Sequence, residues 1–364
     1  MECLVLASTL LLAFVNGAND NMKGAATLYG SGALGYRPAL ALATLSTALG
    51  SLASLALAAG LVKSFSAKGL VPDALLTPAY LAAVALAAGG TVLLATRFGF
   101  PVSTTHALVG ALAGAGFLAA GPDLRVGLLG SAFLLPLVAG PFLGLALAFA
   151  LDRAVARVGS LTGVTRDTRV CVENAAIAFG RPGTGTVASS GLGLVVAHRS
   201  ECANSRDARI FGLEVGRLLD WGHLASASTV GFARGLNDTP KLLGLLVGVD
   251  LVSPRVGVSA VAVAMALGGL VAARRVAETL ANKITPMSAA QGFSANAATA
   301  LLVASASHLS LPVSTTHVST GGIFGIGASG GGLRKRMATE VALAWLATLP
   351  TAALLGLAAM WALR

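Results

Sequence analysis

The sequence predicts an all-α polytopic membrane protein made of two inverted repeats, with broken helices and re-entrant helical hairpins. Three observations support this fold class: an apolar composition, apolar runs of membrane-spanning length, and two motifs that each occur twice in the same order. Of the 364 residues, 55% are hydrophobic and only 11% are charged. A soluble domain carries about 25% charged residues, so the composition favours a chain that lies largely within a bilayer.

Apolar runs long enough to cross a membrane recur along the chain. A helix needs about 20 apolar residues to span the hydrocarbon core, and such runs occupy residues 38–62, 74–96, 124–151 and 256–273. Several spans indicate a multi-pass protein of the cell (plasma or inner) membrane rather than an enzyme with a single anchor. The start Met1-Glu2-Cys3 lacks the basic residues of a secretory signal, so we expect the first helix to be retained.

The formal net charge of +10 is better explained by membrane topology than by a nucleic acid partner. Most of the basic residues lie in loops beside apolar spans, and positive charge in such loops marks the cytoplasmic side. The three cysteines fall at no metal-ligand spacing and offer no disulfide framework. They are Cys3, Cys171 and Cys202.

Two motifs of the first half recur in the second half. Residues 14–23 match residues 232–241 at Phe, Gly, Asn, Asp and Lys. Downstream, Pro-Val-Ser-Thr-Thr-His at residues 101–106 recurs letter for letter at residues 312–317. The order is kept and the spacing is similar, so the sequence predicts a gene-duplicated architecture of two halves.

The number of membrane crossings indicates how the halves are oriented. We expect a helix broken at the Asn-Asp motif and a hairpin with the Pro-Val-Ser-Thr-Thr-His segment at its tip. The first half then crosses three times if the hairpin is re-entrant and five times if both arms span. Either number is odd, so the second half enters from the opposite side, as in secondary transporters with inverted repeats.

An arginine-rich segment separates the halves. We expect residues 1–151 to form the first transmembrane repeat, 152–205 a cytoplasmic connector with short β-like stretches, and 206–364 the second, inverted repeat. The positive-inside rule puts the connector in the cytoplasm and both termini outside it. The arginines on which this depends are Arg153, Arg157, Arg166, Arg169, Arg181, Arg199, Arg206 and Arg209.

Two acids lie within the predicted membrane helices. An acid there costs about 2.5–3.5 kcal/mol on insertion scales and is by default functional. Asp20 follows Asn19, and Asp238 follows Asn237, in stretches that can turn oxygens toward a small hard cation. These residues are the candidate cation-binding or coupling groups, with Asp20 and Asp238 as sodium ligands. The alternative is a structural aspartate that caps a half-helix.

The hairpin tips have the composition of an anion site. Proline ends the incoming arm, and Ser or Thr can cap the outgoing arm, whose first-turn amides then point unpaired into the protein. Two such tips from opposite faces would present hydroxyls and positive dipole ends to a tetrahedral oxyanion. The alternative is ordinary capping at a turn. The candidate substrate-binding residues are Ser103, Thr104, Thr105, Ser314, Thr315 and Thr316.

One histidine follows the hydroxyls of each tip. His106 and His317 could donate to an oxyanion or carry a proton near neutral pH. They could equally hydrogen-bond a neighbouring carbonyl, and the sequence leaves both interpretations open.

The paired Asn-Asp motifs and paired hairpin motifs together resemble the PiT family of inorganic phosphate transporters. The resemblance runs from about residue 14 to residue 327 and omits the connector, and residues 278–293 also resemble the family's stretch ahead of its second hairpin. It implies a sodium- or proton-coupled phosphate symporter with the cations near the Asp motifs and the anion near the Ser-Thr-Thr tips. The implied partners are phosphate, sodium or a proton and the bilayer, with no cofactor besides sodium ions; a homodimer stays open.

One feature departs from the family pattern. Family members usually carry Asn three residues after the motif Asp, whereas Lys23 and Lys241 stand there in this chain. Either each lysine neutralises its aspartate as a helical i,i+3 pair, or a tethered ammonium takes the place of a bound sodium ion. We therefore count both lysines among the coupling residues.

Three other functions compete with phosphate symport. Sulfate or another tetrahedral oxyanion such as arsenate suits the same dipole ends, but sulfate cannot donate a hydrogen bond to a carboxylate at neutral pH. An intramembrane hydrolase is disfavoured because Ser103 and His106 share one hairpin tip and no Gly-x-Ser-x-Gly elbow occurs. A passive anion channel would not need two buried acids.

Overall fold

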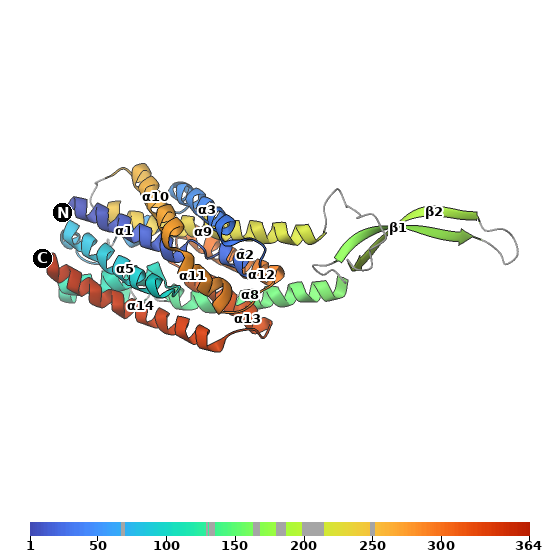
Figure 1. Ribbon diagram of the computed structural model, residues 1–364. Helices are drawn as coiled ribbons and strands as arrows, with labels where there is room; N and C mark the ends of the chain where they lie inside the picture. The colour runs from blue at the N-terminus through green and yellow to red at the C-terminus, as the bar shows by residue number, and fades with distance from the viewer. Residues whose placement is uncertain are drawn as a thin grey trace.

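The helices of the computed structural model run roughly along one axis, and both termini lie at one end of the bundle (Figure 1). The structure describes residues 1–66, 70–128, 130, 135–162, 168–179, 187–198, 215–247 and 252–364. In these ranges seven helices are long and apolar enough to cross a membrane. The predicted helical, polytopic class is confirmed, and the one described sheet lies between α8 and α9.

The first half consists of helices and short helical turns. Its elements are α1 (Glu2–Asp20), α2 (Ala25–Gly30), α3 (Tyr36–Leu57), α4 (Ala59–Phe65), the 3₁₀ turn Asp73–Leu75, α5 (Pro78–Phe98), α6 (Thr104–Ala120), the 3₁₀ turn Gly121–Asp123, α7 (Val126–Leu128) and α8 (Leu135–Thr162).

Two antiparallel strands, β1 (Thr168–Phe179) and β2 (Val187–His198), lie between the halves. The second half has the same order of hairpin and long helices as the first. Its elements are α9 (Val215–Val247), α10 (Pro254–Ala272), α11 (Arg274–Glu278), the π-helical turn Thr279–Lys283, α12 (Ala289–His308), α13 (Thr315–Ser329) and α14 (Lys335–Ala362).

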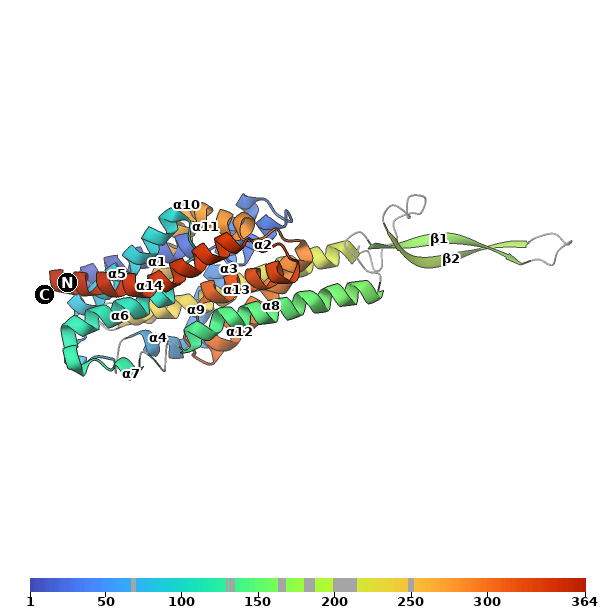
Figure 2. The same cartoon turned by 90° about the horizontal axis from the view of Figure 1, so that it is seen from below.

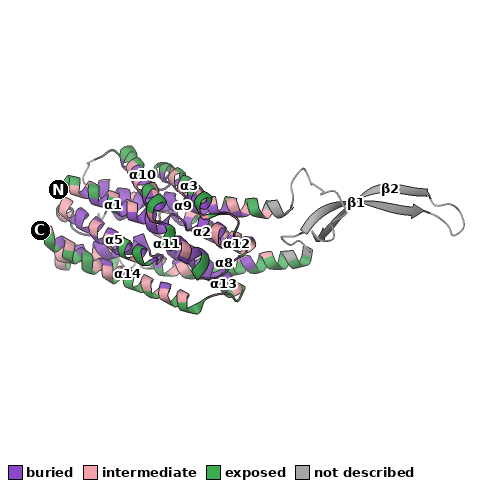
Figure 3. Cartoon of the chain, in the orientation of Figure 1, coloured by how far each residue is buried: buried purple, intermediate pink, exposed green. Residues whose placement is uncertain are grey.

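The outer surface of the bundle is apolar. Buried residues concentrate in the middle, and exposed positions follow the outer faces of α3, α10 and α14 (Figure 3). Large hydrophobic side chains are exposed there, for example Leu45, Val271 and Leu346 at 61%, 74% and 74% of their full accessible area. A monomeric soluble protein rarely exposes such continuous apolar area, so these faces contact lipid.

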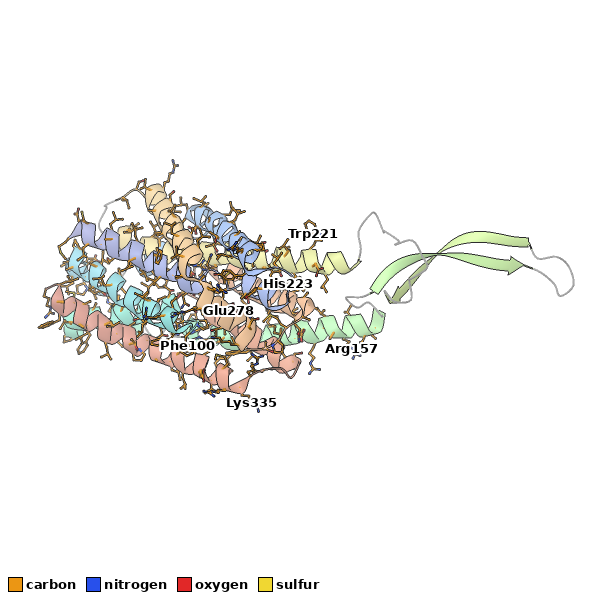
Figure 4. The ribbon with its side chains drawn as sticks, viewed as in Figure 1. Phe100, Arg157, Trp221, His223, Glu278 and Lys335 are labelled. Atoms are coloured by element: carbon orange, nitrogen blue, oxygen red, sulfur yellow. The ribbon has the colours of Figure 1, made fainter. Side chains whose placement is uncertain are left out.

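Two basic residues mark the end of the bundle opposite the termini. Arg157, on the extension of α8, and Lys335, at the start of α14, both lie toward the side from which β1 and β2 project (Figure 4). This distribution agrees with the predicted cytoplasmic connector. The domain limits at residues 151 and 205 and the side on which the termini lie stay predictions, and α8 itself continues past residue 151 to Thr162.

The two Asn-Asp motifs differ in backbone geometry. The first helix breaks as predicted: α1 ends at Asp20, and a turn over residues 21–24 leads into α2. In the second copy α9 runs without a break through Asp238 and Pro240. Intrinsic propensity does not account for the difference, because Gly24 disfavours a helix in the first copy by about 1 kcal/mol whereas Pro240 disfavours one in the second copy by about 3 kcal/mol.

The two hairpins share the same turn geometry. The first arm ends at a residue with positive φ, Gly99 at 77° and Ser310 at 57°. A short extended segment that contains proline follows, and a serine then caps the second arm. The predicted tips at residues 101–106 and 312–317 are confirmed.

Contacts between the halves are reciprocal. Gly17 of α1 lies against the backbone of Met265 in α10, and its counterpart Gly235 of α9 lies against the backbone of Thr47 in α3. A side chain at either glycine would overlap a carbonyl oxygen. Each Asn-Asp helix therefore packs on a helix of the other half.

Each hairpin likewise packs on a helix of the other half. Gly114 of α6 touches the backbone of Ala353 in α14, and Gly325 of α13 touches the backbone of Leu145 in α8. In the view from below, α6 runs beside α14 and α13 beside α8 (Figure 2). This reciprocity supports the predicted duplication, while the opposite orientation of the halves in a membrane stays a prediction.

One expected span lies elsewhere. The run at residues 124–151 was expected as a single helix, but the helix begins at Leu135 and continues to Thr162. Before it, Gly121–Asp123 form a 3₁₀ turn, the amide of Arg125 donates to the carbonyl of Leu70, and α7 covers only Val126–Leu128.

Candidate functional site

The tips of the two hairpins meet inside the bundle. Thr105 Oγ1 donates to the Val313 carbonyl at 3.3 Å, and Thr316 Oγ1 donates to the Val102 carbonyl at 2.9 Å. These two bonds are equivalent under the duplication. The predicted anion-binding segments therefore form one structure instead of two separate sites.

Asp20, the last residue of α1, contacts this junction. Lys23 Nζ is 2.8 Å from Asp20 Oδ1 and donates to Thr315 Oγ1, also at 2.8 Å. Thr316 Oγ1 donates to Asp20 Oδ1 at 3.4 Å, and Thr104 Oγ1 donates to Oδ2 at 3.3 Å. The carboxylate of the first half is thus bound by hydroxyls of both tips.

Asp238 has a related setting on α9. Lys241 Nζ is 3.3 Å from Asp238 Oδ1 and donates to Thr105 Oγ1 at 2.8 Å. Thr315 Oγ1 donates to Asp238 Oδ2 at 3.4 Å. Because Thr315 also accepts from Lys23, this one hydroxyl joins the charges of both halves.

Arg234 is a site residue that the sequence analysis missed. Its Nε is 3.5 Å from Asp238 Oδ2, and its Nη2 donates to Asn16 Oδ1 at 2.7 Å. Asn16 Nδ2 in turn donates to Thr104 Oγ1 at 2.9 Å and to Asp20 Oδ2 at 3.1 Å. A guanidinium in a membrane helix, one turn before a motif acid, was the signal that could have identified it.

The two motif asparagines hold the hairpins. Asn19 Nδ2 donates to the Phe100 carbonyl at 3.0 Å, and its Oδ1 accepts from the Val102 amide at 3.1 Å. Asn237 Nδ2 donates to the Val313 carbonyl at 3.2 Å. Asn19 and Asn237 thus satisfy the backbone of the extended segments, which α-helical bonding leaves open.

The tip serines cap helices, as the alternative interpretation had it. Ser103 Oγ accepts from the His106 amide at 3.0 Å, and Ser314 Oγ accepts from the His317 amide at 3.1 Å. The threonine hydroxyls, in contrast, point at the charged cluster. Caps at both second arms fix where the first-turn amides of α6 and α13 lie.

The histidines contact each other between the tips. The rings of His106 and His317 are 4.3 Å apart, and the His317 ring lies 4.2 Å from that of Trp345. Trp345 Nε1 donates to the Pro101 carbonyl at 2.9 Å. His106 Nδ1 and His317 Nε2 have no hydrogen-bond partner within the described residues.

The cluster is closed to solvent in this structure. Its five charged side chains are each exposed by 5% or less: Asp20, Lys23, Arg234, Asp238 and Lys241. Buried ions are tolerated when paired and hydrogen-bonded. The arrangement gathers ammonium and hydroxyl donors and two helix N-termini at one point, which is the chemistry that binds a tetrahedral oxyanion.

A model of a known protein family matches residues 16–356, and its description is the phosphate transporter family. The match covers both halves and the cluster. The chain belongs to the phosphate transporter family.

Individual relatives agree with this membership. The chain is 30% identical over 97% of its length to a probable low-affinity inorganic phosphate transporter of Mycobacterium bovis, of which the alignment covers 75%. It is 28% identical over 98% of its length to a protein of the same description from Mycobacterium leprae, of which 77% is covered. Among solved structures, one titled the sodium-dependent phosphate transporter matches with a TM-score of 0.76 and 21% identity, covering 100% of this chain and 98% of the other. Members of the family are transporters, and this chain is not an enzyme.

Proposed function

We propose that this chain is a secondary transporter that carries inorganic phosphate across the cell membrane together with a cation. Membership of the phosphate transporter family and the names of the relatives support phosphate as the cargo. The observation that carries the proposal is the meeting of both Ser-Thr-Thr tips over two buried Asp–Lys pairs.

Phosphate would bind by replacing contacts that the cluster now makes internally. Lys23 donates to Thr315 and Lys241 to Thr105, each at 2.8 Å. A phosphate oxygen between an ammonium and a hydroxyl would accept from both groups, so neither would lose its hydrogen bond. The tips would then separate around the anion, and the two halves would expose it to one side at a time.

Coupling would use the aspartates. In this proposal Asp20 and Asp238 balance the cationic groups when phosphate is absent and take a mobile cation, sodium or a proton, when phosphate enters. Lys23 lies 2.8 Å from Asp20 Oδ1, close to where a coordinated sodium ion would sit. Lys23 and Lys241 would therefore act as tethered cations and lower the number of sodium ions required.

The same proposal includes topology. The chain would lie in the plasma or inner membrane with both termini outside the cytoplasm and the segment of residues 152–205 inside it. The shared end of the two termini and the basic residues near β1 and β2 support this orientation (Figures 1 and 4). A homodimer stays a prediction.

Uptake into proteoliposomes tests the proposal. Labelled phosphate would be offered with sodium, potassium and proton gradients imposed separately, and with sulfate or arsenate as competitor. We expect accumulation above the equilibrium level with a sodium or proton gradient and weak inhibition by sulfate. Equilibration without accumulation under every gradient would indicate a passive channel, and preferential accumulation of sulfate would identify another oxyanion as the cargo.

A further inference from the structure

The duplicated motifs differ in charge at one position, and that position lies inside the cluster. Over residues 14–23 and 232–241 both copies have Asp and Lys at the same places, but Asn16 of the first corresponds to Arg234 of the second. Arg234 is 1% exposed and is the largest fully buried side chain among the described residues. The second half thus contributes one more buried cation than the first.

Arg234 contacts residues of both halves, and it is linked to Asp238 directly and to Asp20 through Asn16. On its own helix it lies 3.5 Å from Asp238 Oδ2. Across the interface its Nη1 donates to Asn21 Oδ1 at 3.3 Å and to Thr47 Oγ1 at 3.2 Å, and its Nη2 donates to Asn16 Oδ1 at 2.7 Å. A guanidinium has the several fixed donors that this arrangement uses.

The contact with Asn16 orients an amide toward the hairpin tip. Because Asn16 Oδ1 accepts from Arg234, its Nδ2 faces Thr104 Oγ1 at 2.9 Å and Asp20 Oδ2 at 3.1 Å. Arg234 therefore fixes the orientation of Asn16, and Asn16 donates toward the place where the hairpin tips meet. Through this contact Arg234 influences the anion site without contacting its centre.

The fixed charges of the cluster do not cancel. Two carboxylates, Asp20 and Asp238, face three cationic groups, Lys23, Lys241 and Arg234. Asp238 has two of these cations within 3.5 Å, whereas Asp20 has one. The cluster therefore holds one positive charge in excess, and a buried excess charge is stable only with a counter-ion.

We infer that Arg234 is a third anchored cation that takes the place of one mobile cation, so that the site holds a singly charged phosphate without co-bound sodium, and the aspartates take a mobile cation only when the anion is doubly charged. This inference rests on the proposed function. The lysines alone would leave a neutral cluster that needs one cation for each negative charge of the anion. With Arg234, dihydrogen phosphate is balanced and brings its own proton, whereas a doubly charged phosphate or sulfate leaves one negative charge unbalanced.

Other titratable groups near the site do not remove the excess charge. The hairpin tips bring only His106 and His317, whose rings lie 4.3 Å apart. A charge on either ring would add to the positive excess and not reduce it. The neighbouring helices α3 and α10 present Thr47 to Arg234 and Met265 to α9, which are uncharged.

The test compares Arg234→Gln, which removes the charge and keeps an amide, with Arg234→Lys, which keeps the charge. Arg255→Gln, an exposed arginine at the start of α10, is the matched control. Proteoliposome uptake of labelled phosphate is measured with and without sodium. We expect Arg234→Gln without sodium to lose affinity at least roughly tenfold, because one positive charge near the bound anion is removed. Sodium should restore it. Arg234→Lys, which keeps the charge but not the fixed donors, should lose less affinity than Arg234→Gln and gain no sodium dependence, while Arg255→Gln behaves like the wild type.

A second arm uses only the wild type and so does not depend on the folding of any variant. Between about pH 6 and pH 8 phosphate passes from its singly to its doubly charged form. The apparent KM for total phosphate should rise with pH and stay constant when expressed as dihydrogen phosphate, without sodium. A KM for total phosphate that falls as pH rises would overturn the inference but not the proposed function. An Arg234→Gln variant with wild-type affinity and no sodium response would do the same. Absence of phosphate uptake at every pH would overturn the proposed function with it.

Discussion

Replacing Asp20 by asparagine removes one negative charge from the cluster and changes its shape little. Asp20 accepts hydrogen bonds from Lys23 and Thr316 at Oδ1 and from Asn16 and Thr104 at Oδ2. An asparagine keeps one oxygen for Lys23 and has the same size, and its amide can donate to the Thr104 hydroxyl if the Asn16 amide, which now donates to Oδ2, gives up that bond. We therefore expect Asp20→Asn to fold and insert, yet to lose concentrative phosphate uptake because the carboxylate that takes the mobile cation is gone.

The same substitution should weaken discrimination against sulfate. Phosphate can donate a hydrogen bond to the carboxylate, and sulfate at neutral pH cannot. A hydrogen bond to a charged group contributes about 1.5–3 kcal/mol, so the preference for phosphate over sulfate, expressed as the ratio of phosphate to sulfate affinity, should fall roughly 10- to 150-fold. The assay is displacement of labelled phosphate from purified protein by either anion.

Asp152→Asn is the control for this prediction. Asp152 is a buried aspartate on α8 that lies outside the cluster, so its replacement should change neither uptake nor selectivity. Full concentrative uptake by Asp20→Asn with unchanged selectivity would refute the reasoning, because the carboxylate would then be purely structural.

Three further predictions concern the lysines, the tips and the helix packing. Lys23→Asn combined with Lys241→Asn should make initial phosphate uptake steeply sodium-dependent, and a sodium response equal to that of the wild type would contradict the tethered-cation idea. Thr315→Ala should lower phosphate affinity roughly 10- to 150-fold in a binding assay, whereas Ser314→Ala, which removes a helix cap, should mainly lower stability, by about 1 kcal/mol. Gly114→Ala should destabilise the protein by about 1–3 kcal/mol in detergent unfolding, because the added methyl overlaps a carbonyl of α14; unchanged stability would argue against the α6–α14 contact.

Local chemistry and internal repetition made much of the site predictable. The Pro-Val-Ser-Thr-Thr-His copies predicted two capped hairpins, and both are present with Ser103 and Ser314 as caps. The i,i+3 spacing predicted that Lys23 would reach Asp20 and Lys241 would reach Asp238, and both pairs form. Such features depend on neighbours in the chain, so the sequence contains them directly.

The missed features depend on how distant segments pack. Lys23 reaches Thr315 from the other half, a contact that no local spacing reveals. Arg234 was overlooked because comparing the halves draws attention to matching positions, and its counterpart is Asn16. The unbroken α9 was missed because Pro240, which lies within the motif, disfavours a continuous helix, so the sequence indicated a break there.

The central claim is that phosphate binds where the two hairpin tips meet. Equilibrium binding of labelled phosphate to purified wild type and to Thr105→Ala combined with Thr316→Ala tests it most directly, with thermal unfolding measured on the same samples. We expect the wild type to bind phosphate and the double variant to bind it at least roughly 100-fold more weakly, while the double variant stays folded at the temperature of the binding assay. Equal phosphate affinity in the two proteins would contradict the claim, because the anion would then lie elsewhere.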